Sequence, residues 1–131
     1  LAPAMKEQGM LSPKQIQDMS AEGVIEFGAH TMNHRNLSTV DVEEAKAEIS
    51  DSKQRVEELT GKTCETFSYP FGRFTESVKQ QVAEAGYSSA VTVKKRIEPI
   101  SDVFEVPRVG ILGKMNALQF HLAVTRGKYR L

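Results

Sequence analysis

The sequence predicts an α/β fold in which right-handed crossovers connect the strands of a parallel sheet. Segments with apolar residues at helical spacing alternate four times with short apolar segments typical of strands. The connecting segments are long enough for parallel pairing, which needs a crossover of about a dozen residues. A chain of 131 residues that is 40% hydrophobic can bury about two thirds of its surface, so we expect a single domain with its own core.

The first predicted elements are a helix and a short strand. The run Ser12-Pro13-Lys14-Gln15 is typical of a helix start, with serine as the cap, proline at the first helical position and glutamine returning a bond to the cap. Gly23 is expected to end this helix. Residues 24–29 are mostly apolar and finish in small residues, which predicts a strand that another segment approaches closely at its end. This strand leads directly into His30.

A long helix and a second strand follow. Apolar residues recur at helical spacing over residues 41–60, and Gly61 stands where a left-handed residue commonly ends a helix. Residues 65–69 are predicted to form the second strand, which Pro70-Phe71-Gly72 ends. Ligands collect at the carboxyl ends of the strands in parallel α/β sheets, so the unusual sequences at these two strand ends indicate the functional region.

The second half of the sequence continues the alternation. A helix is predicted between Thr75 as its cap and Gly86 as its terminator. Residues 89–93 are expected to form a third strand. Residues 104–111 are expected to form a fourth, which Pro107 makes an edge or irregular strand.

Composition excludes several classes of function. The 17 lysines and arginines balance 17 acidic residues, so no overall basic field for nucleic acid or anionic lipid is expected. No apolar run approaches the roughly 20 residues that cross a bilayer. Cys64 is the single cysteine and has no histidine near it, so we expect a buried or incidental thiol. The sequence begins without an initiator methionine or the apolar region of a signal peptide, and we expect it to be part of a longer protein.

Two histidines lie four residues apart after the first predicted strand. If the chain turns helically there, His30 and His34 face the same way and can bind one metal ion. The alternative, a pair of surface or turn histidines, stays open for this spacing alone. A zinc-protease signature is absent because Thr31, not a glutamate, follows the first histidine. A catalytic zinc usually has three protein ligands, so the third is expected from elsewhere in the fold or from sequence beyond this chain.

The segments around His30 and Phe71 resemble two motifs of a known family. The run Glu26-Phe27-Gly28-Ala29-His30-Thr31-Met32-Asn33-His34 is similar to the second motif of the polysaccharide deacetylases, E-I-G-x-H-[ST]-x-x-H. The run Ser68-Tyr69-Pro70-Phe71-Gly72 resembles their third motif, R-x-P-[YF]-G. This family is also called the NodB-homology domain or carbohydrate esterase family 4. The resemblance covers about residues 11–111. It implies that residues 1–131 are a portion of one distorted (β/α) barrel domain whose N-terminal part is missing.

The resemblance also implies roles for individual residues. His30 and His34 would be ligands of a divalent metal, expected to be zinc, with cobalt, nickel or iron also suited to such ligands. The backbone N–H of Phe71 would stabilise the oxyanion of the reaction. Tyr69 and Pro70 would shape the substrate groove.

The sequence departs from the family pattern in three ways. The first motif, a T-F-D-D-G segment that supplies the general base and the third metal ligand, is missing. The arginine of the third motif is here Ser68, as in the divergent branch that acts on poly-N-acetylglucosamine. The late histidine that serves as general acid has no clear counterpart. His121 lies in a helix predicted over residues 116–126 and is expected to be a packed or surface residue. Arg108 is expected either to serve the site as a charge partner or to be an exposed edge residue.

The activity that the resemblance implies is metal-assisted hydrolysis of the N-acetyl groups of an amino-sugar polysaccharide by a secreted or cell-envelope protein. The 131 residues alone are expected to be inactive, because the aspartates are absent. One alternative is a non-catalytic glycan-binding or structural domain that retains the histidines as remnants. Another is a cytosolic hydrolase of small amides on the same barrel.

Overall fold

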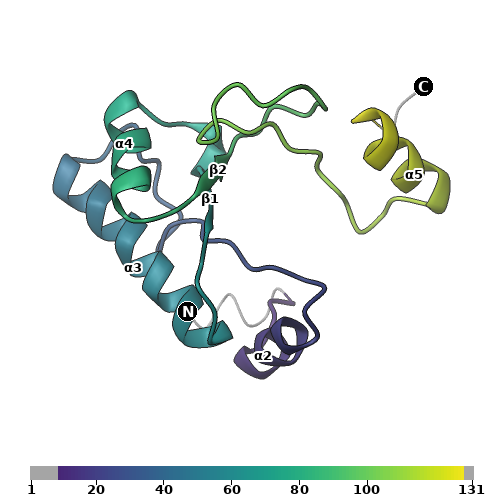
Figure 1. Ribbon diagram of the computed structural model, residues 1–131, viewed down its shortest axis with the longest axis horizontal. Helices are drawn as coiled ribbons and strands as arrows, with labels where there is room; N and C mark the ends of the chain where they lie inside the picture. Colours follow the sequence, from purple (N-terminus) through teal and green to yellow (C-terminus); the bar gives the residue numbers. More distant parts are fainter. Residues whose placement is uncertain (1–8, 129–131) are drawn as a thin grey trace.

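The computed structural model describes residues 9–128. It alternates helices with short parallel strands, and Figure 1 shows the strands near the middle of the molecule. In chain order the elements are α2 (Pro13–Ala21), α3 (Val42–Thr60), β1 (Thr66–Ser68), the 3₁₀ turn η1 (Pro70–Gly72), α4 (Glu76–Glu84), β2 (Ser89–Val91) and α5 (Ala117–Arg126).

The helices begin where the sequence predicts. Each has a polar residue at its N-cap whose side chain accepts a hydrogen bond from a backbone N–H of the first turn; these caps are Ser12, Asp41, Thr75 and Asn116. Ser12 and Asn116 form the complete capping boxes that their sequences indicate. Gly61 ends α3 in the left-handed conformation with φ 67°, as expected.

The sheet consists of neighbouring parallel segments in chain order. β1 pairs with β2, and isolated parallel bridges join Ala29 to Phe67 on one side and Val91 to Val106 on the other. Four predicted strands are therefore adjacent as expected, but the outer two are reduced to single bridges. Pro107 follows the Val106 bridge directly and has no N–H to continue it.

The first segment lies very close to β1 at its end. The Ala29 N–H donates to the Thr66 carbonyl at 2.9 Å, and the Ser68 N–H donates to the Ala29 carbonyl at 2.8 Å. A Cβ atom at Gly28 would lie 2.5 Å from Thr66 Oγ1. The predicted close approach is thus confirmed. The upstream end of the segment diverges into solvent, and Val24 is 80% exposed.

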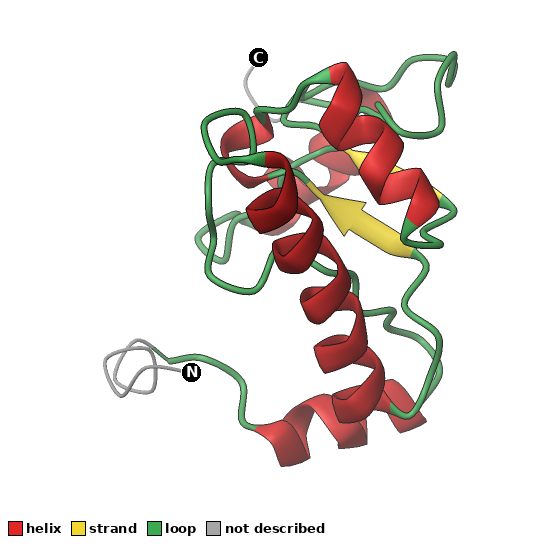
Figure 2. Ribbon diagram, turned by 90° about the vertical axis from the view of Figure 1, so that its left-hand side faces the viewer, coloured by secondary structure: helices red, strands yellow, loops and turns green. Residues whose placement is uncertain are grey.

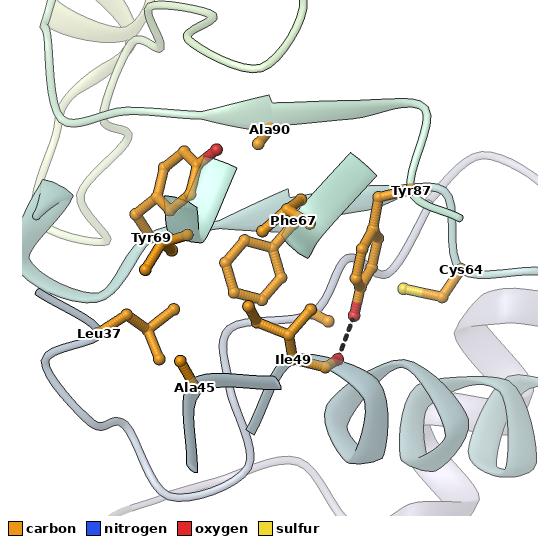
Figure 3. Close-up of a cluster of buried hydrophobic side chains, with 11 residues drawn as sticks. Leu37, Ala45, Ile49, Cys64, Phe67, Tyr69, Tyr87 and Ala90 are labelled. Carbon is orange, nitrogen blue, oxygen red and sulfur yellow. Dashed lines mark hydrogen bonds between the residues drawn. The ribbon is translucent and has the colours of Figure 1, made fainter. Parts of the chain in front are cut away.

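The core lies between the strands and the long helix α3. Figure 2 shows α3 running beside the strands, and Figure 3 shows Ile49 of that helix facing Phe67 of β1. Both side chains are buried. The Tyr87 hydroxyl donates to the Ile49 carbonyl at 3.0 Å across the same core. Cys64 is buried beside them, and burial raises the pKa of its thiol, so the expectation of a buried cysteine is confirmed.

The C-terminal helix α5 lies apart from the strands (Figure 1). Apolar side chains on it are exposed, including Leu118 and Val124. His121 is an exposed residue of this helix, as the sequence indicates. Within residues 9–128, no helix is long and apolar enough to cross a membrane.

Candidate metal centre

The turn after the first strand segment brings the two histidines together. The ring centroids of His30 and His34 are 4.8 Å apart, with an edge-on angle of 66° between the rings. The turn is not the helical one that the spacing suggested. Thr31 and His34 adopt left-handed backbone conformations, with φ 62° and 56°. These values are unusual for residues other than glycine, and such strain gathers at functional sites.

His30 is fixed in orientation by the end of β1. Its Nδ1 lies 2.7 Å from the Ser68 carbonyl oxygen. A carbonyl oxygen only accepts, so Nδ1 carries the proton and the lone pair of Nε2 is left for a ligand. The ring reaches the surface, but the atoms packed around it lower the pKa of His30, and the charges of His34 and Arg108 lower it further against the opposing effect of the Ser68 carbonyl. The neutral imidazole that results is the form that binds metal ions.

A buried carboxylate on α3 holds the middle of the histidine turn. Glu48 Oε2 accepts the backbone N–H of Asn33 at 2.8 Å, and Oε1 accepts its side-chain amide at 2.6 Å. Glu48 is only 7% exposed. Sequence reasoning missed this contact. The available signal was a charged residue on the inward face of the helix, next to Ala45 and Ile49.

The turn η1 places Phe71 against the histidine pair. The rings of Phe71 and His34 have centroids 4.7 Å apart. Phe71 has φ 58°, a third left-handed residue other than glycine at this edge of the sheet. Within residues 9–128 its backbone N–H donates to no acceptor of the chain. Phe71 thus combines a side chain packed on His34 with a backbone donor that has no acceptor among the described residues.

The residues before Phe71 support this turn from beneath. Tyr69 is fully buried, stacks on Phe74 at 4.2 Å between ring centroids and donates its hydroxyl to the Phe104 carbonyl at 3.0 Å. Pro70 is also buried. Neither side chain presents surface to a ligand in this structure, so any contribution to a substrate groove would come through the position of the backbone.

Two further predicted residues lie at the same edge. Arg108 is exposed, and its charge reaches the imidazole of His30. Ser68 stands where the motif that the sequence resembles has an arginine, and its hydroxyl, like that of Thr31, is buried without a hydrogen-bond partner among residues 9–128. A buried hydroxyl without a partner calls for an explanation, such as backbone strain, an ordered water or a bound group.

The donor set of the described residues is incomplete. In the part of the chain that the structure describes, no three histidine, cysteine or acidic side chains gather closely enough to hold a metal ion. The 4.8 Å between the ring centroids of His30 and His34 matches the spacing of two imidazoles that bind one zinc ion. At a zinc–nitrogen distance of about 2.1 Å, two imidazoles at a tetrahedral angle have ring centroids about 5 Å apart.

An open polar recess adjoins His34, lined mainly by the segment 33–41 and Glu44 of α3.

Comparison with known proteins decides the family. The model of the family described as polysaccharide deacetylase matches residues 3–90. This chain belongs to that family. Its two motif turns, its parallel strands and its helices are a portion of the distorted (β/α) barrel of polysaccharide deacetylases, and the predicted fold class is confirmed.

Three relatives illustrate the range of the family. YxkH of Bacillus subtilis (strain 168), named for the same family, is 27% identical over 84 residues, which are 64% of this chain and 30% of YxkH. The structure of the Streptococcus pyogenes deacetylase PplD, in complex with acetate, has a TM-score of 0.73 at 26% identity and matches 83% of this chain and 50% of PplD. BA3943 of Bacillus anthracis, described as a pseudoenzyme of carbohydrate esterase family 4, has a TM-score of 0.54 at 19% identity, with 60% and 27% covered. This chain thus spans half or less of the length of each of these three relatives.

Proposed function

We propose that this chain carries one half of a metal-dependent active site that hydrolyses N-acetyl groups on an amino-sugar polysaccharide. The observation that carries the proposal is the pair of adjacent imidazoles, with Nε2 of His30 left free by the bond from Nδ1 to the Ser68 carbonyl. Membership of the polysaccharide deacetylase family supports the reaction class. The N-acetylated glycan and a secreted or cell-envelope location are part of the proposal.

Each residue of the site has a separate task. His30 and His34 hold a divalent cation, expected to be zinc, which when bound polarises a carbonyl and makes water a nucleophile. The Phe71 N–H stabilises the negative oxygen that develops on the amide, and loss of one such donor typically costs about 3 kcal/mol. Tyr69 and Pro70 hold the turn that lines the groove. Arg108 contributes a positive charge beside His30.

The general base is not among these residues. The sequence contains no Asp-Asp pair. We propose that carboxylates outside residues 1–131 complete the site, and that these 131 residues alone have little or no activity. Residues 1–131 then form part of a single domain.

Metal content tests the histidine pair directly. The protein that contains this sequence is prepared with His30→Ala and, as a matched control, with His121→Ala, which removes an exposed histidine on α5. We expect the parent and His121→Ala to bind one zinc and to scatter anomalously between His30 and His34, and His30→Ala to lose the metal. Equal metal content in all three proteins would exclude the site.

A second candidate function is glycan binding without catalysis. It is favoured by the absence of a three-donor cluster in residues 9–128 and by Ser68 at the position of the motif arginine. Acetate release from chito-oligosaccharides by the protein that contains this sequence separates the two candidates. Release that disappears in His30→Ala supports the enzyme, whereas binding of the oligosaccharide without release supports the binding domain.

A further inference from the structure

The histidine turn depends on a backbone conformation that its own sequence does not favour. Thr31 and His34 both lie in the left-handed region, and Thr31 is β-branched, the side-chain type that tolerates this region least. Strained residues of this kind persist only where the surroundings determine the conformation. Some group outside the turn must therefore hold it.

Glu48 of helix α3 provides hydrogen bonds that fix the turn. It lies on α3 next to Ile49 and Ala45, both fully buried in the core. Its carboxylate accepts hydrogen bonds from the backbone N–H and from the side-chain amide of Asn33, the residue before His34. One contact is to the backbone, so it fixes the path of the chain between the two histidines.

The hydrogen bonds from Asn33 also stabilise the buried carboxylate of Glu48. In the described part of the chain no lysine or arginine forms an ion pair with Glu48, and its described hydrogen bonds all come from Asn33. A buried carboxylate is costly unless it is hydrogen-bonded. The helix and the turn therefore depend on each other at this point. Glu48 is not grouped with the histidines as a metal-binding cluster, so the geometry does not make it a ligand.

We propose that Glu48 is a positioning residue that presets the turn at residues 30–34, so that the imidazoles of His30 and His34 stand side by side before any metal binds. The consequence for metal affinity rests on the proposed function, whereas the presetting of the turn does not. Groups that orient metal ligands through a hydrogen bond typically change metal affinity by about 10–100-fold when they are removed.

The test compares two glutamates of the same helix. Glu48→Gln keeps the shape of the side chain but turns an amide N–H toward one of the two Asn33 donors. Glu43→Gln changes the charge equally at an exposed position of α3. Hydrogen–deuterium exchange is measured on the metal-free protein for peptides that span residues 30–36 and for peptides of β1.

We expect exchange in residues 30–36 to rise about tenfold or more in Glu48→Gln and to stay unchanged in Glu43→Gln, with β1 unchanged in both. Glu48→Ala, which removes both acceptors, is expected to show a larger rise in the same peptides. If Glu48→Ala does not fold, Glu48→Gln decides alone. Unchanged exchange in residues 30–36 would overturn the proposal. An equal rise in exchange across the whole chain would also overturn it, because that result is expected of a residue that is needed only for global stability.

Titration with Co²⁺ then separates this proposal from the proposed function. We expect Co²⁺ affinity to fall about tenfold in Glu48→Gln and to stay unchanged in Glu43→Gln. If the parent binds no Co²⁺, the proposed function fails and the exchange result alone decides the role of Glu48. If the parent binds and Glu48→Gln binds equally well, the positioning role is wrong while the metal site stands.

Discussion

The turn at residues 30–34 and the turn at residues 69–73 meet at the ring of His34, and each contains a residue other than glycine in the left-handed conformation. They are held by different forces. The first is tied to α3 by two hydrogen bonds from Asn33 to the buried carboxylate of Glu48. The second rests on buried side chains beneath it. The first turn can therefore be disrupted by the loss of a polar contact and the second by a change in packing. Variants that target one turn or the other distinguish the two causes.

Gly72 carries the largest expected effect, because the second turn has no room for a side chain there. Its φ is 65°, and a Cβ would lie 2.4 Å from Val93 Cγ2. Gly72→Ala is expected to lower the free energy of unfolding by about 2–4 kcal/mol, the sum of left-handed strain and steric overlap. Denaturant unfolding measures this loss.

The double variant Gly72→Ala/Val93→Ala separates those two causes. Val93 is 47% exposed, so its truncation alone costs little packing. We expect the double variant to recover more than half of the lost free energy, leaving the backbone strain. No recovery would mean that the Val93 contact does not limit the turn.

Thr31 is expected to have a smaller effect of opposite sign. Its φ of 62° strains a β-branched residue, and its hydroxyl is buried without a partner in the part of the chain that the structure describes. Thr31→Gly removes both costs, so we expect a gain of about 0.5–1 kcal/mol after allowing for the greater backbone entropy of glycine in the unfolded chain. The control is Met32→Gly, at a neighbouring position without positive φ, which is expected to lose stability by denaturant unfolding. A loss in both variants would show that the turn is not strained at Thr31.

Local signals in the sequence predict the helices well, and the sheet edges and turns poorly. The capping box at Ser12 and the left-handed Gly61 depend on neighbouring residues alone, so the sequence contains the whole signal. Pro107 does signal the irregular fourth strand, but residues 24–29 contain no comparable signal, and their reduction to a single bridge at Ala29 depends on which segment lies beside them.

The same limit applies to the candidate site. The four-residue spacing of His30 and His34 predicts that the two rings lie close together, and they do. The helical turn expected from the same spacing is wrong, because nothing in the run Thr-Met-Asn-His indicates that Thr31 and His34 are left-handed. Glu48 lies on the apolar face of α3, which indicates a buried carboxylate, but it is distant in sequence from Asn33. Its partner becomes visible only when α3 lies against the turn.

The pH dependence of stability between pH 8 and pH 5 gives the smallest expected effect, and of the two turns it concerns the first, through His30. Burial lowers the pKa of His30 in the folded chain below the ordinary value of about 6.5. Between the two pKa values the unfolded chain binds more protons, so stability falls as the pH drops through about 6.5 and the loss is complete below the folded pKa. The ring is partly exposed, so solvent screening keeps the effect small.

Melting temperatures between pH 8 and pH 5 measure this effect in the metal-free chain. Parent and His121→Gln are expected to lose stability together as the pH falls, while His30→Gln gives a flatter profile because it removes the group that must remain neutral. If His30→Gln keeps the slope of the parent, the imidazole is not desolvated in the folded chain. The turn would then present a hydrated histidine, and the bond to the Ser68 carbonyl, which raises the pKa of His30, would favour the protonated ring over the neutral form that metal binding needs.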